Sequence, residues 1–234
     1  MEKKKRGSFT GEIGFVLAAA GSAVGLGNLW RFPYLAAQYG GGIFILVYII
    51  LALTFGFTLM TTEIAIGRKT KLSPTRAYKE VDSKFGFIGP IAFIIPVIIL
   101  PYYCVIGGWV TKYVTVFAAG QNIAAAEDSF FGNFIGREYA PLIFFIIFLG
   151  LTSLIVISGV EKGIEKVSSY LMPALIVLAV IICIYVITIP GSSAGIKYYL
   201  LPDFSKFSFK TVCAAMGQMF YSMSLAMGIM ITYG

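Results

Sequence analysis

The chain has 234 residues, of which 58% are hydrophobic and 12% charged, and its mean hydropathy is +0.86. A soluble domain carries more charge and fewer apolar residues, so this composition excludes one and predicts an integral membrane protein. The net charge of +7 does not indicate a nucleic-acid partner, because that would need a soluble basic face with interleaved aromatic residues, which the sequence does not offer.

Six stretches are apolar over about the 20 residues that a helix needs to cross a bilayer. They are continuously apolar, unlike the short alternating segments of a membrane barrel, so we expect helices. The prediction is an all-α polytopic protein of the cell membrane, with residues 1–234 forming a single transmembrane region. The expected spans are 12–37, 41–67, 86–118, 140–158, 167–189 and 210–234.

The first span is interrupted by a glycine-rich run from Gly21 to Asn28, and Arg31 follows closely. Irregular backbone at membrane depth persists only beside protein, water or a ligand. The run therefore indicates either a ligand site or, through Gly21 and Gly25, a close-packed helix face. No strand precedes it and no Gly-Lys-Ser/Thr follows it, which argues against a phosphate loop. Apolar sequence continues to Ala37, so we do not expect a cleaved signal peptide.

The loop at 68–85 is basic and contains Ser73-Pro74, a pair typical of a helix that starts with proline. Lysine and arginine gather in alternate loops, which places the N-terminus in the cytoplasm by the positive-inside rule. Twelve of the eighteen fall on that side: Lys3, Lys4, Lys5, Arg6, Arg68, Lys69, Lys71, Arg76, Lys79, Lys84, Lys162 and Lys166.

The last span, 210–234, is the second irregular one. Gln218, Ser222 and Ser224 lie at mid-membrane among small residues. Taken alone, this pattern favours a packed helix whose serines bond back to its own carbonyls, with an interrupted helix as the alternative. The chain then stops at Gly234 without an inner loop or a charged tail, which predicts a truncation.

The residue types argue against catalysis. The sequence has no histidine, which removes the commonest general base and metal ligand. Cys104, Cys183 and Cys213 lie far apart in apolar stretches, and we expect them to be small buried packing residues. These features predict a protein that is not an enzyme.

Two interrupted spans separated by four continuous ones resemble the neurotransmitter:sodium symporter family, which has the leucine-transporter fold. The resemblance implies one five-helix repeat and the first helix of an inverted second repeat, with helices 1 and 6 broken. It also implies that a missing second half is needed for transport. The matching strings, in the family's order, are Ala20–Pro33, Gly40–Gly42, Glu63–Arg68, Tyr102–Tyr103, Gly159–Lys166 and Gly217–Gly228.

The resemblance implies sodium-coupled symport of an amino acid by alternating access. A first sodium ion would bind the Ala23 carbonyl, the Asn28 side chain, and the carbonyl and hydroxyl of Ser222. A second would bind the carbonyls of Gly21 and Val24, with its other ligands on a helix that the chain does not contain.

The first break also creates a new helix start at Leu26 and Gly27, whose amides attract a carboxylate. The family adds the hydroxyl of Tyr103 there. Monoamine transporters of the family carry Asp where this chain has Gly25, so the expected substrate brings its own carboxylate and is a neutral, hydrophobic or aromatic amino acid. The residues that the resemblance places around it are Ala23, Leu26, Gly27, Ile99, Tyr103, Tyr221, Ser222, Ser224 and Met227.

The resemblance further implies two gates. Arg31, with Gln218 nearby, would form half of an outer gate, and Arg6 and Phe9 would belong to an inner gate. An intramembrane arginine is costly and marks a functional site. Glu63 is expected to hydrogen-bond the unwound part of the sixth helix, and the alternative is a helix-end acid near the basic loop.

Other interpretations remain open from sequence alone. A passive channel would line one continuous polar path, and a membrane enzyme would need paired carboxylates or an equivalent dyad. A non-transporting half is a further alternative. Chloride dependence is open as well, because Tyr48, Gln218 and Ser222 fit a chloride site but the deciding position lies outside the chain. The sequence does not give the oligomeric state.

Overall fold

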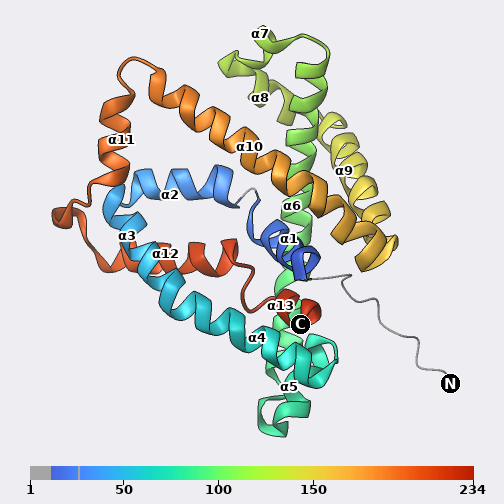
Figure 1. The fold of residues 1–234 in the computed structure, drawn as a ribbon. Helices are drawn as coiled ribbons and strands as arrows, with labels where there is room; N and C mark the ends of the chain where they lie inside the picture. Colours follow the sequence, from blue (N-terminus) through green and yellow to red (C-terminus); the bar gives the residue numbers. More distant parts are fainter. Residues whose placement is uncertain (1–11, 26) are drawn as a thin grey trace. The chain divides into compact units, whose positions relative to one another are not determined.

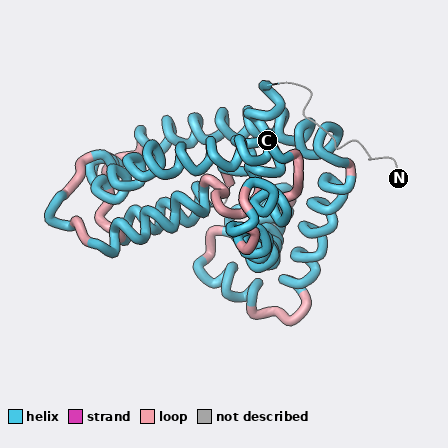
Figure 2. Tube along the Cα trace, turned by 90° about the horizontal axis from the view of Figure 1, so that it is seen from below, coloured by secondary structure: helices cyan, strands magenta, loops and turns pink. Residues whose placement is uncertain are grey.

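The structure, a computed structural model, describes residues 12–25 and 27–234. Those residues form helices and connecting loops without a strand, and Gly41 and Pro202 make an isolated bridge (Figure 2). The described chain falls into two compact units. One comprises Ile94–Ile164, and the other joins the described residues from Glu12 to Phe93 to Glu165–Gly234.

Four helical segments are long and apolar enough to cross a membrane: Gly42–Thr70, Ser83–Ala118, Ala140–Ile157 and Gly163–Thr188. A fifth candidate is the pair Glu12–Ala23 and Gly27–Gln38, which is bent by 46°. A second interrupted segment consists of α12 (Phe209–Ser222) and α13 (Ile229–Tyr233) (Figure 1). The expected all-α fold with broken first and sixth helices is therefore confirmed.

The unit that contains both breaks is made of helices from the two ends of the chain. Its elements are α1 (Glu12–Ala23), the π-helical turn η1 (Gly27–Arg31), α2 (Phe32–Gln38), α3 (Gly42–Leu51), the π-helical turn η2 (Ala52–Gly56), α4 (Phe57–Thr70), α5 (Pro74–Val81), the short turn η3 (Ser83–Phe85), α10 (Lys166–Thr188), α11 (Ser192–Leu200), the short turn η5 (Phe204–Lys206), α12 and α13.

The core of this unit lies where α3 packs against α12. Phe44 of α3 and Met219 of α12 are fully buried there. Phe32, at the start of α2, places its ring edge-on to Phe44 at 5.6 Å and to Tyr48 at 4.9 Å between centroids. Aromatic and aliphatic side chains thus hold the residues that follow the first break against the helix that carries the second.

Close backbone contacts fix the second break against α4 and α5. A Cβ atom added at Gly67 would overlap the carbonyl of Ile231, and one added at Gly228 would lie 2.5 Å from Pro74 Cγ. The helix α5 begins at Pro74 directly after Ser73, as the sequence predicts. Gly228 also has a φ of 73°, so glycine meets both the steric and the conformational requirement.

The helix α11 joins the end of α2 to the approach to α12. The hydroxyl of Tyr198 donates to the Ala37 carbonyl at 2.8 Å, and that of Tyr199 donates to the Pro33 carbonyl at 3.0 Å. Two tyrosine hydroxyls thus join α11 to α2 through backbone carbonyls of α2.

The other unit contains most of α6 (Ile88–Ala118), with α7 (Asn122–Ala125), α8 (Asp128–Ile135), α9 (Ala140–Ile157) and the turn η4 (Val160–Glu165) leading out of it. A Cβ atom at Gly107 would lie 2.4 Å from Cε1 of the Phe148 ring, and one at Gly108 would lie 2.8 Å from the amide nitrogen of Phe145. Small residues thus let α6 and α9 approach closely, as is common between membrane helices.

The expectation for the cysteines holds only in part. Cys104 is buried, whereas Cys183 and Cys213 are exposed at the surface of the chain. The prediction of burial was wrong for these two, because an apolar span can turn a small residue outward as readily as inward.

Candidate functional site

Among the residues that the structure describes, no backbone amide donates to the carbonyls of residues 21–24 at the first break. The amide of Val24 donates to the Ala20 carbonyl at 2.7 Å, and the next backbone bonds run from the amides of Asn28 and Leu29 to the Gly25 carbonyl, at 3.0 and 3.2 Å. The carbonyls of residues 21–24 lie between these two sets of bonds. Backbone oxygens that have left a helix are available to other donors or to a cation.

Asn28 lies against this group of carbonyls. Its Nδ2 donates to the Ala23 carbonyl at 3.1 Å, and its buried Oδ1 has no hydrogen-bond partner among the described residues. A buried oxygen of this kind is unusual in a folded protein, because desolvation without a partner costs about 1–3 kcal/mol. The side chain of Asn28 thus places its nitrogen against the Ala23 carbonyl and leaves its oxygen buried beside the first break.

The second break has alternating left-handed residues. Ser224, Ala226 and Gly228 have φ values of 53°, 61° and 73°. The amide of Leu225 donates to the Phe220 carbonyl at 3.0 Å, and helical bonding resumes with Thr232. Left-handed backbone costs a non-glycine residue about 1–2 kcal/mol, so surrounding contacts must hold this segment in place.

The two breaks contact each other directly. Ser224 Oγ donates to the Ser22 carbonyl at 2.8 Å, and Gln218 Nε2 donates to the Gly27 carbonyl at 2.9 Å. A Cβ atom at Gly27 would lie 2.6 Å from Cε1 of Tyr221, so the ring of Tyr221 packs onto bare backbone. Side chains of the second break thus fix the backbone of the first.

Gln218 also connects the first break to the intramembrane arginine. Its side chain is fully buried, and its Oε1 accepts a hydrogen bond from Arg31 Nη1 at 3.2 Å. The Arg31 guanidinium lies over the Tyr221 ring, 5.1 Å from its centroid. A charge-assisted bond and a cation–π contact together stabilise a cation that has left water.

Ser222 lies in a short chain of hydroxyls. Its Oγ is 2.7 Å from the Tyr48 hydroxyl and donates to the Gln218 carbonyl at 2.7 Å. Because the single Ser222 proton is directed to that carbonyl, Tyr48 is the donor in the other bond. Tyr48, Gln218 and Ser222, which the sequence groups as candidates for chloride, are therefore in contact.

Glu63 supports the second break from α4. Its Oε1 accepts the amide of Ala226 at 2.7 Å, and its buried Oε2 has no hydrogen-bond partner in the described ranges 12–25 and 27–234. Burial raises the pKa of Tyr78 on the neighbouring α5, and the negative charge of Glu63 raises that pKa further. The Glu63 carboxylate therefore accepts a hydrogen bond from Ala226, one of the left-handed residues of the second break.

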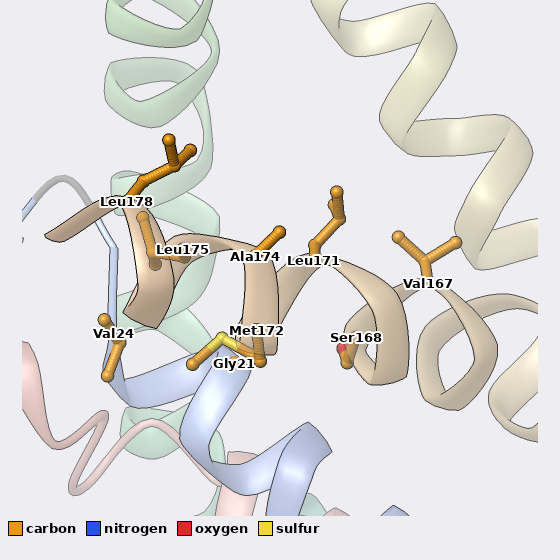
Figure 3. Close-up of a pocket in the computed structure, with 9 residues that line it drawn as sticks. All are labelled: Gly21, Val24, Val167, Ser168, Leu171, Met172, Ala174, Leu175 and Leu178. Carbon is orange, nitrogen blue, oxygen red and sulfur yellow. The ribbon is translucent and has the colours of Figure 1, made fainter. Parts of the chain in front are cut away.

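A groove of about 420 Å³ borders the first break, between the end of α1 and α10 (Figure 3). Gly21 and Val24 line one side of it, and a Cβ atom at Gly21 would lie 3.1 Å from Ser168 Oγ. The remaining lining residues are Val167, Ser168, Leu171, Met172, Ala174, Leu175 and Leu178. The groove therefore exposes a mostly apolar wall beside the carbonyls expected for a second sodium ion.

The oxygens at the breaks are of the kinds that suit an alkali cation. Within the described residues, no three His, Cys, Asp or Glu side chains come together. A cation at the breaks would accordingly be bound by carbonyl, amide and hydroxyl oxygens.

Some expected site residues are not placed with the breaks. Ile99 and Tyr103 lie on α6 in the other unit, so their roles stay predictions. Arg6, Phe9 and Leu26 lie outside the described residues. Met227 is half-buried within the second break.

Sequence reasoning missed the Ser22 carbonyl as the partner of Ser224, which it placed in the substrate pocket. It also missed the contact of Pro74 with Gly228. Both are contacts between distant segments, for which a single sequence carries no signal.

Comparison with known proteins identifies the arrangement. A family model described as the sodium:neurotransmitter symporter family matches residues 6–126 and 133–234. An uncharacterized sodium-dependent transporter of Bacillus subtilis is 34% identical over 241 residues, covering 100% of this chain and 53% of the relative. The human sodium- and chloride-dependent taurine transporter is 26% identical over 274 residues, which cover 98% of this chain and 44% of the taurine transporter.

The crystal structure of MhsT in complex with L-phenylalanine superposes with a TM-score of 0.91 at 35% identity. The match covers 98% of this chain and 53% of MhsT, so the chain spans about half the length of the relatives it matches. With two broken helices in contact and a family model matched over nearly its whole length, the chain belongs to the sodium:neurotransmitter symporter family.

Proposed function

We propose that the protein carries out sodium-coupled symport of a neutral amino acid, hydrophobic or aromatic, by alternating access. The chain matches about half the length of its relatives, so the proposal concerns a protein in which a counterpart of the other half is also present. The membrane would be crossed several times with the N-terminus in the cytoplasm, in keeping with the distribution of lysine and arginine.

One observation carries the proposal. The buried Oδ1 of Asn28 has no partner within the described part of the chain, and the same amide lies against the carbonyl of Ala23. Sodium is a small cation that prefers oxygen ligands, and once the amide has turned over, the Ala23 and Asn28 oxygens could both bind it. Ser222, on the second break, is the further ligand that we propose for this ion. The carbonyls of Gly21 and Val24, beside the groove, would serve a second sodium ion.

The chemistry around Gly25 supports an amino acid as the substrate. A Cβ atom added at Gly25 meets nothing within 4 Å, so packing does not require glycine at this position. With no carboxylate at that position, a zwitterion has to supply its own. Its carboxylate would bind at the helix start near Gly27, because the amides there carry partial positive charge. MhsT, in its complex, holds L-phenylalanine.

We also infer that the protein has no catalytic role. Arg31, Gln218 and Tyr221 would act as one side of an outer gate, because they form a closed network beside the proposed substrate site. Glu63 would keep the second break in its left-handed conformation and takes no part in chemistry.

The test is uptake of labelled phenylalanine into proteoliposomes that contain the protein as its gene encodes it. We expect saturable uptake that requires external sodium and fails with potassium. Replacement of Asn28 by alanine removes one proposed ligand, so we expect the half-saturating sodium concentration to rise about tenfold or more.

Asn133→Ala, on the exposed face of α8, is the matched control and should leave the sodium dependence unchanged. Current that flows with sodium but without any amino acid would instead support a channel. Equal sodium dependence in the Asn28→Ala variant and the parent would refute the proposed ligand set.

A further inference from the structure

A basic surface lies where the chain leaves the membrane between two spans. The apolar segment Gly42–Thr70 ends just before α5, and the next one, Ser83–Ala118, begins just after it. Arg76 and Lys79 stand three residues apart on α5, and Lys84 follows in the turn η3. All three side chains are exposed. We call these three residues the basic face.

The positive charge of the basic face is not neutralised within the described part of the chain. Glu80 and Asp82 are the acids nearest in sequence, and neither comes within ion-pair distance of the three cations among the described residues. Asp82 instead accepts the backbone amide of Lys84 at 2.9 Å, which caps the turn. The basic face is therefore available to an anion from outside the chain.

Aromatic side chains lie beside these cations. The chain folds back after η3, so that a Cβ atom at Gly86 would be 3.3 Å from Lys79 Cβ. Phe85 and Phe87, on either side of that glycine, are 52% and 62% exposed. Aromatic rings next to lysine at the end of a span are the combination that settles at the membrane–water interface.

We propose that the basic face binds the phosphate headgroups of anionic phospholipids while Phe85 and Phe87 lie in the adjoining interface. Lipid is the occupant that the geometry favours, because Arg76 and Lys79 lie between two membrane spans, Lys84 lies at the very start of the second span, and bilayer phosphates occur at that depth. Positive charge in a loop also directs insertion into the membrane, but that role requires no affinity for a headgroup.

The test is native mass spectrometry of the full chain in detergent micelles, titrated with phosphatidylglycerol and separately with phosphatidylcholine. The parent should bind phosphatidylglycerol in preference. Each lysine or arginine near an anionic surface contributes about fivefold to affinity, so the triple variant Arg76→Gln, Lys79→Gln, Lys84→Gln should bind phosphatidylglycerol about 100-fold more weakly.

Two matched variants separate this site from charge in general. Lys197→Gln, Lys206→Gln, Lys210→Gln removes three exposed cations elsewhere in the same unit and should keep the preference. Arg76→Lys, Lys79→Arg, Lys84→Arg keeps the charge, so it should keep binding and also show that these positions tolerate substitution. Equal weakening in both glutamine variants, no preference in the parent, or full competition by inorganic phosphate alone would overturn the proposal.

Discussion

Replacement of Glu63 tests whether a single side chain on α4 holds the second break. Leucine at this position removes the acceptor of the Ala226 amide, which is 2.7 Å from Glu63 Oε1. Glutamine keeps an oxygen in that place. The two substitutions therefore separate the hydrogen bond from the negative charge.

The magnitude follows from the contacts of the two carboxylate oxygens. A buried amide that loses its acceptor costs about 1–3 kcal/mol. Removing Oε2, which is buried without a partner, offsets part of that loss, so we expect Glu63→Leu to destabilise the chain by about 1–2 kcal/mol. Glu63→Gln should lose less than half as much. Ala226→Gly, combined with Glu63→Leu, should recover about 1 kcal/mol because glycine adopts a φ of 61° without strain.

The assay is denaturant unfolding of the chain in detergent micelles, followed by circular dichroism. Glu80→Gln, an exposed acid on α5, is the control and should change the free energy of unfolding by less than about 0.5 kcal/mol. A Glu63→Leu variant as stable as the parent would refute the reasoning. So would a glutamine variant as unstable as the leucine variant.

Two further predictions concern contacts between the breaks, and the same unfolding assay measures both. Gly27→Ala forces the ring of Tyr221 to move and should destabilise the chain by about 1–3 kcal/mol. Gly25→Ala adds a methyl group where no atom lies within 4 Å, so it should be neutral or slightly stabilising. Equal effects at the two glycines would contradict the packing. Ser224→Ala removes the donor to the Ser22 carbonyl and should lose about 1 kcal/mol, while Ser224→Gly should lose less because it also relieves the left-handed φ. An alanine variant more stable than the glycine variant would contradict this order.

Local signals in the sequence predict the breaks and the helix starts. Three glycines within Gly21–Asn28 predict an interruption of the helix, and Ser73-Pro74 predicts the start of α5. These are properties of short segments, so periodicity and turn chemistry are enough. The sixth helix is harder, because its serines are equally suited to an unbroken helix, and only the family resemblance favoured the break.

The pairing between the breaks is beyond such reasoning. Ser22 and Ser224 are 202 residues apart, and the hydrogen bond that joins them depends on how α1 and α12 pack. The family resemblance places Ser224 in the substrate pocket, which stays a prediction, and in the structure the hydroxyl of Ser224 donates to the Ser22 carbonyl of the first break. Residue propensities do not predict which acceptor a serine hydroxyl will bond, because a small hydroxyl on irregular backbone can reach either a ligand or a neighbouring carbonyl.

The geometry of Asn28 gives the proposed sodium site a definite requirement. In the structure its Nδ2, not its Oδ1, is directed at the Ala23 carbonyl. A sodium ion needs both oxygens to face it, so the amide must turn over and give up that hydrogen bond when the ion enters. Asn28→Asp supplies an oxygen in either orientation but loses the hydrogen bond. It should therefore be less stable than the parent in potassium, by about 3 kcal/mol or more because a buried carboxylate then lies beside the Ala23 carbonyl without a counter-charge, and recover that difference in saturating sodium. Unfolding measured in the two salts tests this, and an aspartate variant with the same deficit in both would show that Asn28 serves the backbone alone.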